Sequence, residues 1–317
     1  GFSLVELMIA ITISLLLLAG VIQIFLASRQ TYTMQDGMSR LQENARYALD
    51  RISQDIARSG YMGCSDSAAV AIANNLLDQT GRFDFTTPIA GEDNTGVDGT
   101  DVLTLRFGSS GGIHLTDKYD TDTKYSLQID STNPNYNNIR QYDLMTFGDC
   151  GHIMVVMITN DPGTSAGAIQ FNPGIAADSG PNQGQENISG DWNGLEPIGT
   201  EKGSYATAFS ISSTTYLVGA STSGTGNSLY VDSIAPANEL IQGVEDFQVQ
   251  FGVNNDTDLG ADRYVAADDV GAANWNNVVS MRLTLRLNTV DPVQAGATIA
   301  KDFTTTVRLR NRGDTIL

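Results

Sequence analysis

A single carboxylate, Glu6, lies inside the long apolar stretch GFSLVELMIAITISLLLLAGVIQIFL. A charged side chain in hydrocarbon costs about 2.5–3.5 kcal/mol on insertion scales, so such a residue marks a function and needs a cationic partner. A glutamate near a helix end can also extend to the lipid headgroups, which is the alternative interpretation of Glu6 taken alone. The predicted chemistry is therefore electrostatic pairing within, or at the edge of, a membrane.

Cys64 and Cys150 are the two cysteines of the chain. In an exported protein an even number of cysteines favours one intramolecular disulfide, which would stabilise the fold by roughly 4–5 kcal/mol in the chain-entropy model. The alternative is two separate buried thiols. Without a CxxC motif, two cysteines and a distant histidine make a poor metal site.

Catalytic residue patterns are absent from the sequence. A general base must be held within reach of the proton that it removes. His114 and His152 are the only histidines in the sequence, and neither lies in a catalytic motif. The Gly-Ser-Ser-Gly-Gly run at 108–112 differs from a nucleophile elbow and indicates a turn after a strand. We expect no enzymatic activity.

One loop carries oxygen ligands at alternate positions, as a calcium loop does. Its candidate ligands are Asn254, Asp256, Asp258 and Asp262. The sixth-place glycine and twelfth-place glutamate of a calcium loop are missing, so a solvated acidic hairpin is the more common outcome. Asp117, Asp120 and Asp122 form a weaker cluster. We therefore expect no cofactor and keep calcium as an alternative.

The charge balance restricts the partners. The 317 residues include 36 acids and 18 bases, giving a net charge of −18. Nucleic acid is excluded as a partner because it requires a basic surface. Basic side chains gather near the C-terminus, at Arg282, Arg286, Lys301, Arg308, Arg310 and Arg312. They could pair with the acidic body of the domain, with an acidic neighbour, or face solvent.

The element that must position Glu6 is a long helix. Leu4 to Leu26 is apolar enough to cross a bilayer, and the first proline is Pro88. An amphipathic stripe with helical period follows, formed by Met34, Met38, Leu41, Ala45, Ala48, Leu49, Ile52 and Ile56. Charged residues, including Asp55, occupy the other faces. We predict one helix over 2–59, about 85–90 Å long, weakened at Gly20 and Gly37.

The remainder of the chain has β character. Apolar residues alternate with polar ones over 103–107, 247–253, 279–287 and 303–309, and 153–158 is a short apolar run. The last three alternating segments predict an antiparallel sheet with one face covered by the helix. Residues 160–200 and 219–228 are rich in Gly, Ser, Thr and Asn, which predicts long surface loops.

These patterns predict an α+β fold in three parts. Residues 1–28 form a membrane-length apolar helix, 29–60 its amphipathic continuation, and 61–317 a β-rich domain with long loops.

The Gly-Phe-Ser-Leu-Val-Glu start resembles the processing site of type IV prepilins, a superfamily that includes the pseudopilins of type II secretion. The resemblance implies a type IV pilin-like fold, in which residues 1–28 would form a transmembrane and later filament-core helix and 61–317 a periplasmic or extracellular domain. It also implies that a prepilin peptidase cuts between Gly1 and Phe2 and methylates the Phe2 amine, while the apolar segment is retained. Glu6 would then pair with the Phe2 amine of a neighbouring subunit.

The C-terminal segments IQGVEDFQVQFG at 241–252, VVSMRLTLRL at 278–287 and FTTTVRLRNR at 303–312, with LQENARYAL at 41–49, resemble the PilW family of minor pilins. They are more distantly similar to J-type minor pseudopilins. The resemblance does not extend to the region of about 65–235.

A PilW-like chain is implied to be a low-copy minor pilin. It would join other minor pilins in an inner-membrane complex that primes pilus assembly, and then lie at the extracellular pilus tip. Its implied partners are the major pilin and a large tip adhesin, with roles in cell adhesion and twitching motility. Retention of Glu6 implies a place below another minor pilin. The alternatives are a J-type pseudopilin, a membrane-anchored adhesin or a calcium-binding module.

Overall fold

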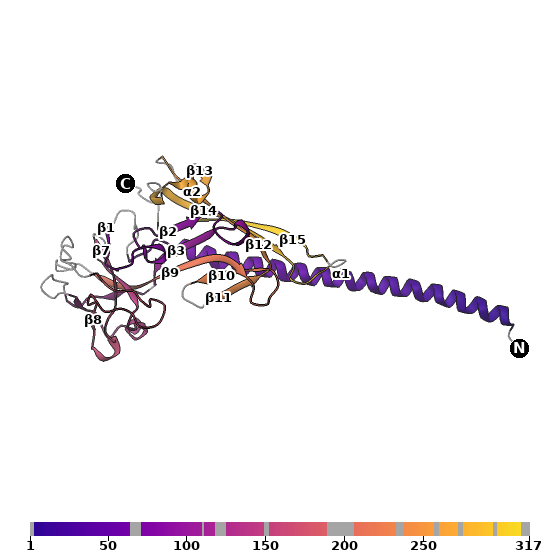
Figure 1. The fold of residues 1–317 in the computed structure, drawn as a ribbon, viewed down its shortest axis with the longest axis horizontal. Coiled ribbons are helices and arrows are strands. Elements are labelled where there is room, and N and C mark those ends of the chain that lie inside the picture. The colour runs from indigo at the N-terminus through magenta and orange to yellow at the C-terminus, as the bar shows by residue number, and fades with distance from the viewer. Residues whose placement is uncertain are drawn as a thin grey trace.

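One long helix and a β-rich domain around its second half make up the fold (Figure 1). The computed structural model describes residues 3–63, 71–109, 111–117, 125–148, 152–188, 206–232, 238–256, 260–271, 275–293 and 297–311. The helix, α1, spans Leu4–Arg58 and is about 80 Å long at 1.5 Å per residue. This architecture confirms the predicted α+β fold with a long N-terminal apolar helix.

α1 ends close to its predicted position because the chain turns at a glycine. Ser59 follows the helix, and its amide donates to the Asp55 carbonyl at 2.9 Å. Gly60 has a φ of +82°, a conformation that glycine adopts without steric cost. Its amide donates to the Arg106 carbonyl at 3.0 Å, which attaches the helix end to β3 (Val102–Gly108).

A four-stranded sheet covers one side of the helix. Its strands, in the order β13-β12-β14-β15, are β12 (Val244–Val253), β13 (Arg263–Val265), β14 (Val278–Asn288) and β15 (Ala300–Arg308). Leu285 of β14 lies opposite Phe247 on one side and Phe303 on the other, in antiparallel pairs. α1 contacts both β14 and β15. The predicted antiparallel sheet, and its cover by the helix, are confirmed.

A second, nine-stranded sheet is built by the middle of the chain. Its strands are β1 (Ala71–Asn74), β2 (Ile89–Glu92), β3, β4 (Ile113–His114), β6 (Leu144–Gly148), β7 (His152–Met157), β9 (Thr207–Ala220), β10 (Asn227–Asp232) and β11 (Asn238–Gln242). All pairs are antiparallel except β1 with β7. A separate pair joins β5 (Ser126–Gln128) to β8 (Ala168–Gln170), and a short helix, α2 (Ala267–Val270), contacts β2 and β12.

Strand β9 connects the two ends of the β domain. Its first residues pair with β4 and β6, and its later ones pair with β3 and β10. Figure 1 shows β1, β7 and β8 at the end of the molecule farthest from the N-terminus, and β10 and β11 beside the helix. The long strand therefore joins the distal part of the domain to the part that packs on α1.

The prediction of a long surface loop at 219–228 is wrong. β9 continues to Ala220, β10 begins at Asn227, and the Ser221 amide donates to the Gly226 carbonyl at 3.0 Å. Small polar residues are compatible with strand ends as well as loops, so composition alone did not distinguish a tight hairpin from a long excursion. Within the other predicted loop, 160–200, strand β8 lies at 168–170.

Candidate assembly helix

Glu6 lies in the first turn of α1, on a part of the helix that the domain leaves uncovered. No residue from Ser3 to Arg40 is buried, and Figure 1 shows this part projecting away from the sheets. The helix is long and apolar enough to cross a membrane, by length and composition. A helix that is apolar on all faces is normally surrounded by lipid or by other apolar helices.

Glu6 differs from the other polar residues of this segment. The Thr12 hydroxyl donates to the Ile9 carbonyl at 2.8 Å, and the Ser14 hydroxyl donates to the Ala10 carbonyl at 2.8 Å. An ionised carboxylate only accepts hydrogen bonds, so it cannot be satisfied by helix carbonyls. The first basic side chain along α1 is Arg29, roughly 35 Å further on. Within the described part of α1, no basic side chain lies close enough to pair with Glu6.

The predicted processing residues Gly1 and Phe2 lie outside the described residues, as do Cys64 and Cys150. The cleavage and methylation site and the disulfide stay predictions. Glu6 is the one member of the predicted processing and assembly motif that the structure places.

The second half of α1 is held by the predicted apolar stripe. Leu41, Ala45, Ala48, Ile52 and Ile56 are buried in one core with residues of both sheets. Met34, predicted to belong to this stripe, is 41% exposed, because the domain begins to bury the helix only at Leu41. The boundary between the free and the packed helix therefore lies later than the change in sequence pattern at Arg29.

Asp55 was predicted on a face of the helix other than the buried stripe, and this is wrong: its exposure is 0%. It accepts a hydrogen bond from the Tyr216 hydroxyl at 2.6 Å. Arg51 Nε lies 3.5 Å from the same carboxylate oxygen, and Arg58 pairs with the other. The Arg58 guanidinium lies 4.6 Å from the centre of the Phe107 ring. Buried carboxylates require such partners.

The network attaches α1 to β9 and β3 at a fixed rotation. Burial raises the pKa of the Tyr216 hydroxyl, and its hydrogen bond to Asp55 raises it further. Tyr216 therefore stays protonated and donates to the carboxylate. The sequence did contain a signal for this contact: Asp55 stands between Ile52 and Ile56 on the apolar stripe, where a charged residue needs a buried partner.

Gly37 allows the loop after β14 to lie against the helix. A Cβ atom at this position would be 2.7 Å from Val293 Cγ1 and 3.3 Å from Thr289 Cγ2. Gly20, in the projecting part, has no atom within 4 Å of its Cβ position. Both glycines weaken the helix by propensity, but only Gly37 has a packing role in the described structure.

We expect Gly37→Ala to destabilise the domain by about 1 kcal/mol, because overpacking against Val293 costs about 1–3 kcal/mol and outweighs the roughly 1 kcal/mol gained in helix propensity. Thermal unfolding of the purified chain in detergent measures the change. Gly20→Ala is the matched control and should leave the unfolding temperature of the domain unchanged. A rise in that temperature with Gly37→Ala would contradict the packing role.

Edge strand β11 is stabilised by a carboxylate that binds hydroxyl groups. Glu239 accepts from Ser228 at 2.6 Å, from Ser221 at 2.9 Å and from Thr222. These hydrogen bonds, the one from Ser228 first, lower the pKa of Glu239 from 4.5 to about 2. They stabilise the ionised form and join the hairpin turn after β9 to β11.

This lowered pKa predicts a pH dependence of stability. A carboxylate whose pKa is lower in the folded state contributes stability above its unfolded pKa, and this contribution is lost as the pH falls through the folded pKa. The wild type should therefore unfold at a higher temperature than Glu239→Gln at pH 5 and above. This difference in unfolding temperature should shrink as the pH falls from 4.5 to about 2. A difference that does not change with pH would contradict the assignment.

Among the described residues, the candidate calcium ligands do not form a cluster. The Asp262 carboxylate accepts the Asn255 amide at 2.7 Å, and the Asn254 side chain accepts the Asp256 amide at 2.9 Å, so these oxygens help to close the loop. Asp258 lies outside the described residues. Within the described chain, no group of three or more His, Cys, Asp or Glu could hold a metal.

The C-terminal basic residues pair in part with the acidic body of the domain. Arg286 Nε lies 2.8 Å from Glu245, and its Nη1 lies 3.1 Å from Asp302. The Arg282 guanidinium stacks 4.0 Å from the Tyr264 ring. Of the two histidines, His114 contacts the Thr207 hydroxyl at 3.4 Å on the β4–β9 pair, and the side chain of His152 is outside the description.

The fold and the helix together define a class: a protein with a single apolar N-terminal helix suited to membrane anchoring, whose second half forms the core of an α+β domain. Residues 215–311 match the family model PilW, described as Type IV Pilus-assembly protein W. This C-terminal region of the chain is therefore similar to PilW-family type IV pilus proteins. The matched region runs from the later part of β9 to just beyond β15, and so contains the sheet that covers the helix. Comparisons with curated proteins and with solved structures gave no match.

Proposed function

We propose that this chain is a minor pilin that joins a priming complex in the inner membrane, initiates type IV pilus assembly and remains at the pilus tip. It is proposed to act through assembly rather than catalysis, with other minor pilins, the major pilin and a tip adhesin as partners. The PilW match supports a role in pilus assembly.

One observation carries the finer proposal: Glu6 lies on a projecting apolar helix whose first basic side chain, Arg29, is roughly 35 Å away. After cleavage at Gly1, the Phe2 amine of a neighbouring subunit supplies the cation. Pairing removes the cost of an isolated charge in the membrane, and it sets the axial position of one helix against the next.

The proposal is tested by purifying the tagged full-length chain from cell envelopes and identifying the proteins that copurify. We expect minor pilins and the major pilin. Copurification with pseudopilins of a type II secretion system instead would reject the pilus assignment and favour a J-type role.

A further inference from the structure

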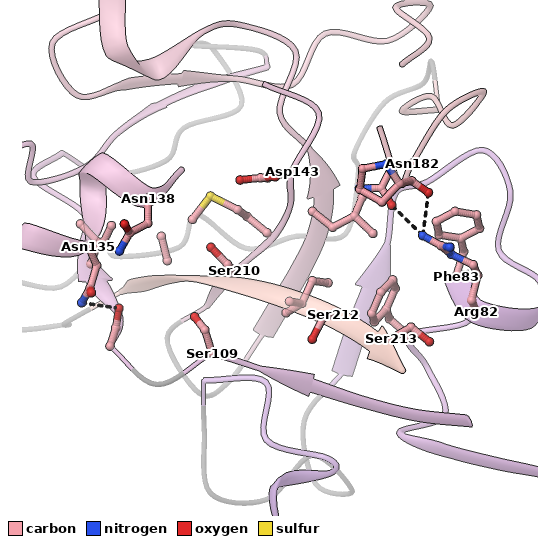
Figure 2. A pocket seen from close by; sticks show the side chains of 18 residues that line it. Arg82, Phe83, Ser109, Asn135, Asn138, Asp143, Asn182, Ser210, Ser212 and Ser213 are labelled. Atoms are coloured by element: carbon pink, nitrogen blue, oxygen red, sulfur yellow. Dashed lines mark hydrogen bonds between the residues drawn. The ribbon is translucent and has the colours of Figure 1, made fainter. Parts of the chain in front are cut away.

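A cavity of about 370 Å³ lies in the part of the β domain distant from the membrane helix (Figure 2). Its floor is formed by β9 and the start of β6, and its walls come from the segments around residues 82, 109 and 135. All of its lining residues precede residue 215, where the family match begins. The cavity size is at the lower end of the range for small-molecule sites, about 300–1,000 Å³.

Most of the polar lining consists of neutral hydroxyl and amide groups, which can both donate and accept hydrogen bonds. Figure 2 shows the hydroxyls of Ser109 and Ser210 across the opening from Asp143, with the amides of Asn135 and Asn138 at one end. Ser213 also lines the cavity, and its hydroxyl oxygen is buried with no hydrogen-bond partner among the described residues.

The charges lining the cavity balance. At the end opposite the two asparagines, the Arg82 guanidinium donates to the Pro181 carbonyl at 2.8 Å and to Asn182 at 3.1 Å, and lies 4.7 Å from the Phe83 ring. Asp143 accepts the Arg140 amide at 2.7 Å, and partial burial raises the pKa of its carboxyl group. One acid and one base, set apart from each other along the cavity, do not favour a phosphate or a polycation.

Apolar groups complete the lining. Phe83 contributes half-buried aromatic surface beside the hydroxyls and amides, while Phe85, Ile113 and Met145, which also border the cavity, are almost fully buried. A ligand that fits must therefore present several neutral hydroxyl groups on one side and C–H groups on another. Among common biological ligands of this size, a pyranose ring has both features. Its neighbouring hydroxyls match a carboxylate and amides, and its C–H face matches an aromatic wall.

From these observations we propose that the cavity binds one neutral pyranose ring of a glycan, held by Asp143, Asn138 and the serine hydroxyls of β9. The site is lined by residues of the β domain and by none from the projecting half of α1. It does not depend on the pairing of Glu6.

The test uses the full-length chain in micelles of a detergent without a sugar headgroup. Saturation-transfer NMR is recorded with glucose, galactose, mannose and N-acetylglucosamine. The neutral peptide acetyl-Ala-Ala-amide is measured in the same way, to test whether the cavity binds a peptide instead of a sugar. The variants are Asn138→Ala and Asp143→Asn. The second keeps an oxygen that can accept the Arg140 amide, and thermal unfolding checks that both variants fold.

Asn137→Ala is the matched control, because Asn137 is the neighbour of Asn138 on the same short 3-10 helix (Pro134–Asn138) and does not line the cavity. We expect at least one sugar to bind, at least tenfold more weakly to the two cavity variants, and unchanged to the control. The proposal is rejected if no sugar gives a signal, if only the peptide does, or if the control weakens binding as much as Asn138→Ala.

Discussion

Glu6→Ala should reduce incorporation of the chain into the minor-pilin complex at least tenfold while leaving its β domain folded. The substitution removes the only acid in the apolar segment, and with it the charge that would attract the amine of the next subunit. A loss of 1.4 kcal/mol of pairing free energy already gives a tenfold effect, and the cost of an unpaired charge in a membrane is about 2.5–3.5 kcal/mol. Copurified minor pilins and surface pili are the two readouts.

Two further variants separate the charge from general polarity. Thr12→Ala removes a polar group from the same segment, but its hydroxyl bonds only the Ile9 carbonyl of its own helix, so assembly should be unaffected. Glu6→Gln keeps the shape and removes the charge, and it should behave like Glu6→Ala. Normal piliation and copurification in both Glu6 variants would contradict the pairing role. Loss of piliation or copurification in Thr12→Ala would show that any polar change in this segment disturbs assembly.

Asp55→Ala should lower the stability of the domain by about 3 kcal/mol. It leaves the buried Tyr216 hydroxyl without its acceptor and removes the shared partner of Arg51 and Arg58. Breaking a buried ion pair costs about 3–5 kcal/mol, and we expect the low end because both arginine side chains are about half exposed. Thermal unfolding should show a decrease on the order of 5–10 °C for a domain of this size.

Asp50→Ala is the matched control for this prediction. Asp50 is on the same helix and lies 3.7 Å from Arg46, but its side chain is 66% exposed. An exposed pair of this kind contributes at most about 0.5 kcal/mol. If the two variants unfold at the same temperature, the Asp55 network does not hold the helix, and the apolar stripe alone explains the docking of α1.

The periodic elements were predictable from the sequence because their apolar spacing is local information. The helix predicted over 2–59 is α1, Leu4–Arg58, and the strands predicted over 247–253, 279–287 and 303–309 lie within β12, β14 and β15. Each of these segments buries one regular face, so its period reveals both its type and the side that packs. The unusual position of Glu6 followed from the same kind of local pattern.

Tertiary structure alone decided which residues meet across the chain. Asp55 and Tyr216 are far apart in sequence, and their contact depends on where β9 passes the helix. The distal cavity collects side chains from several segments between Arg82 and Ser213 that share no motif. A sequence pattern records how one segment alternates between buried and exposed positions. It does not record the strand order and register that bring polar side chains together, so those sites emerge only once the sheets are assembled.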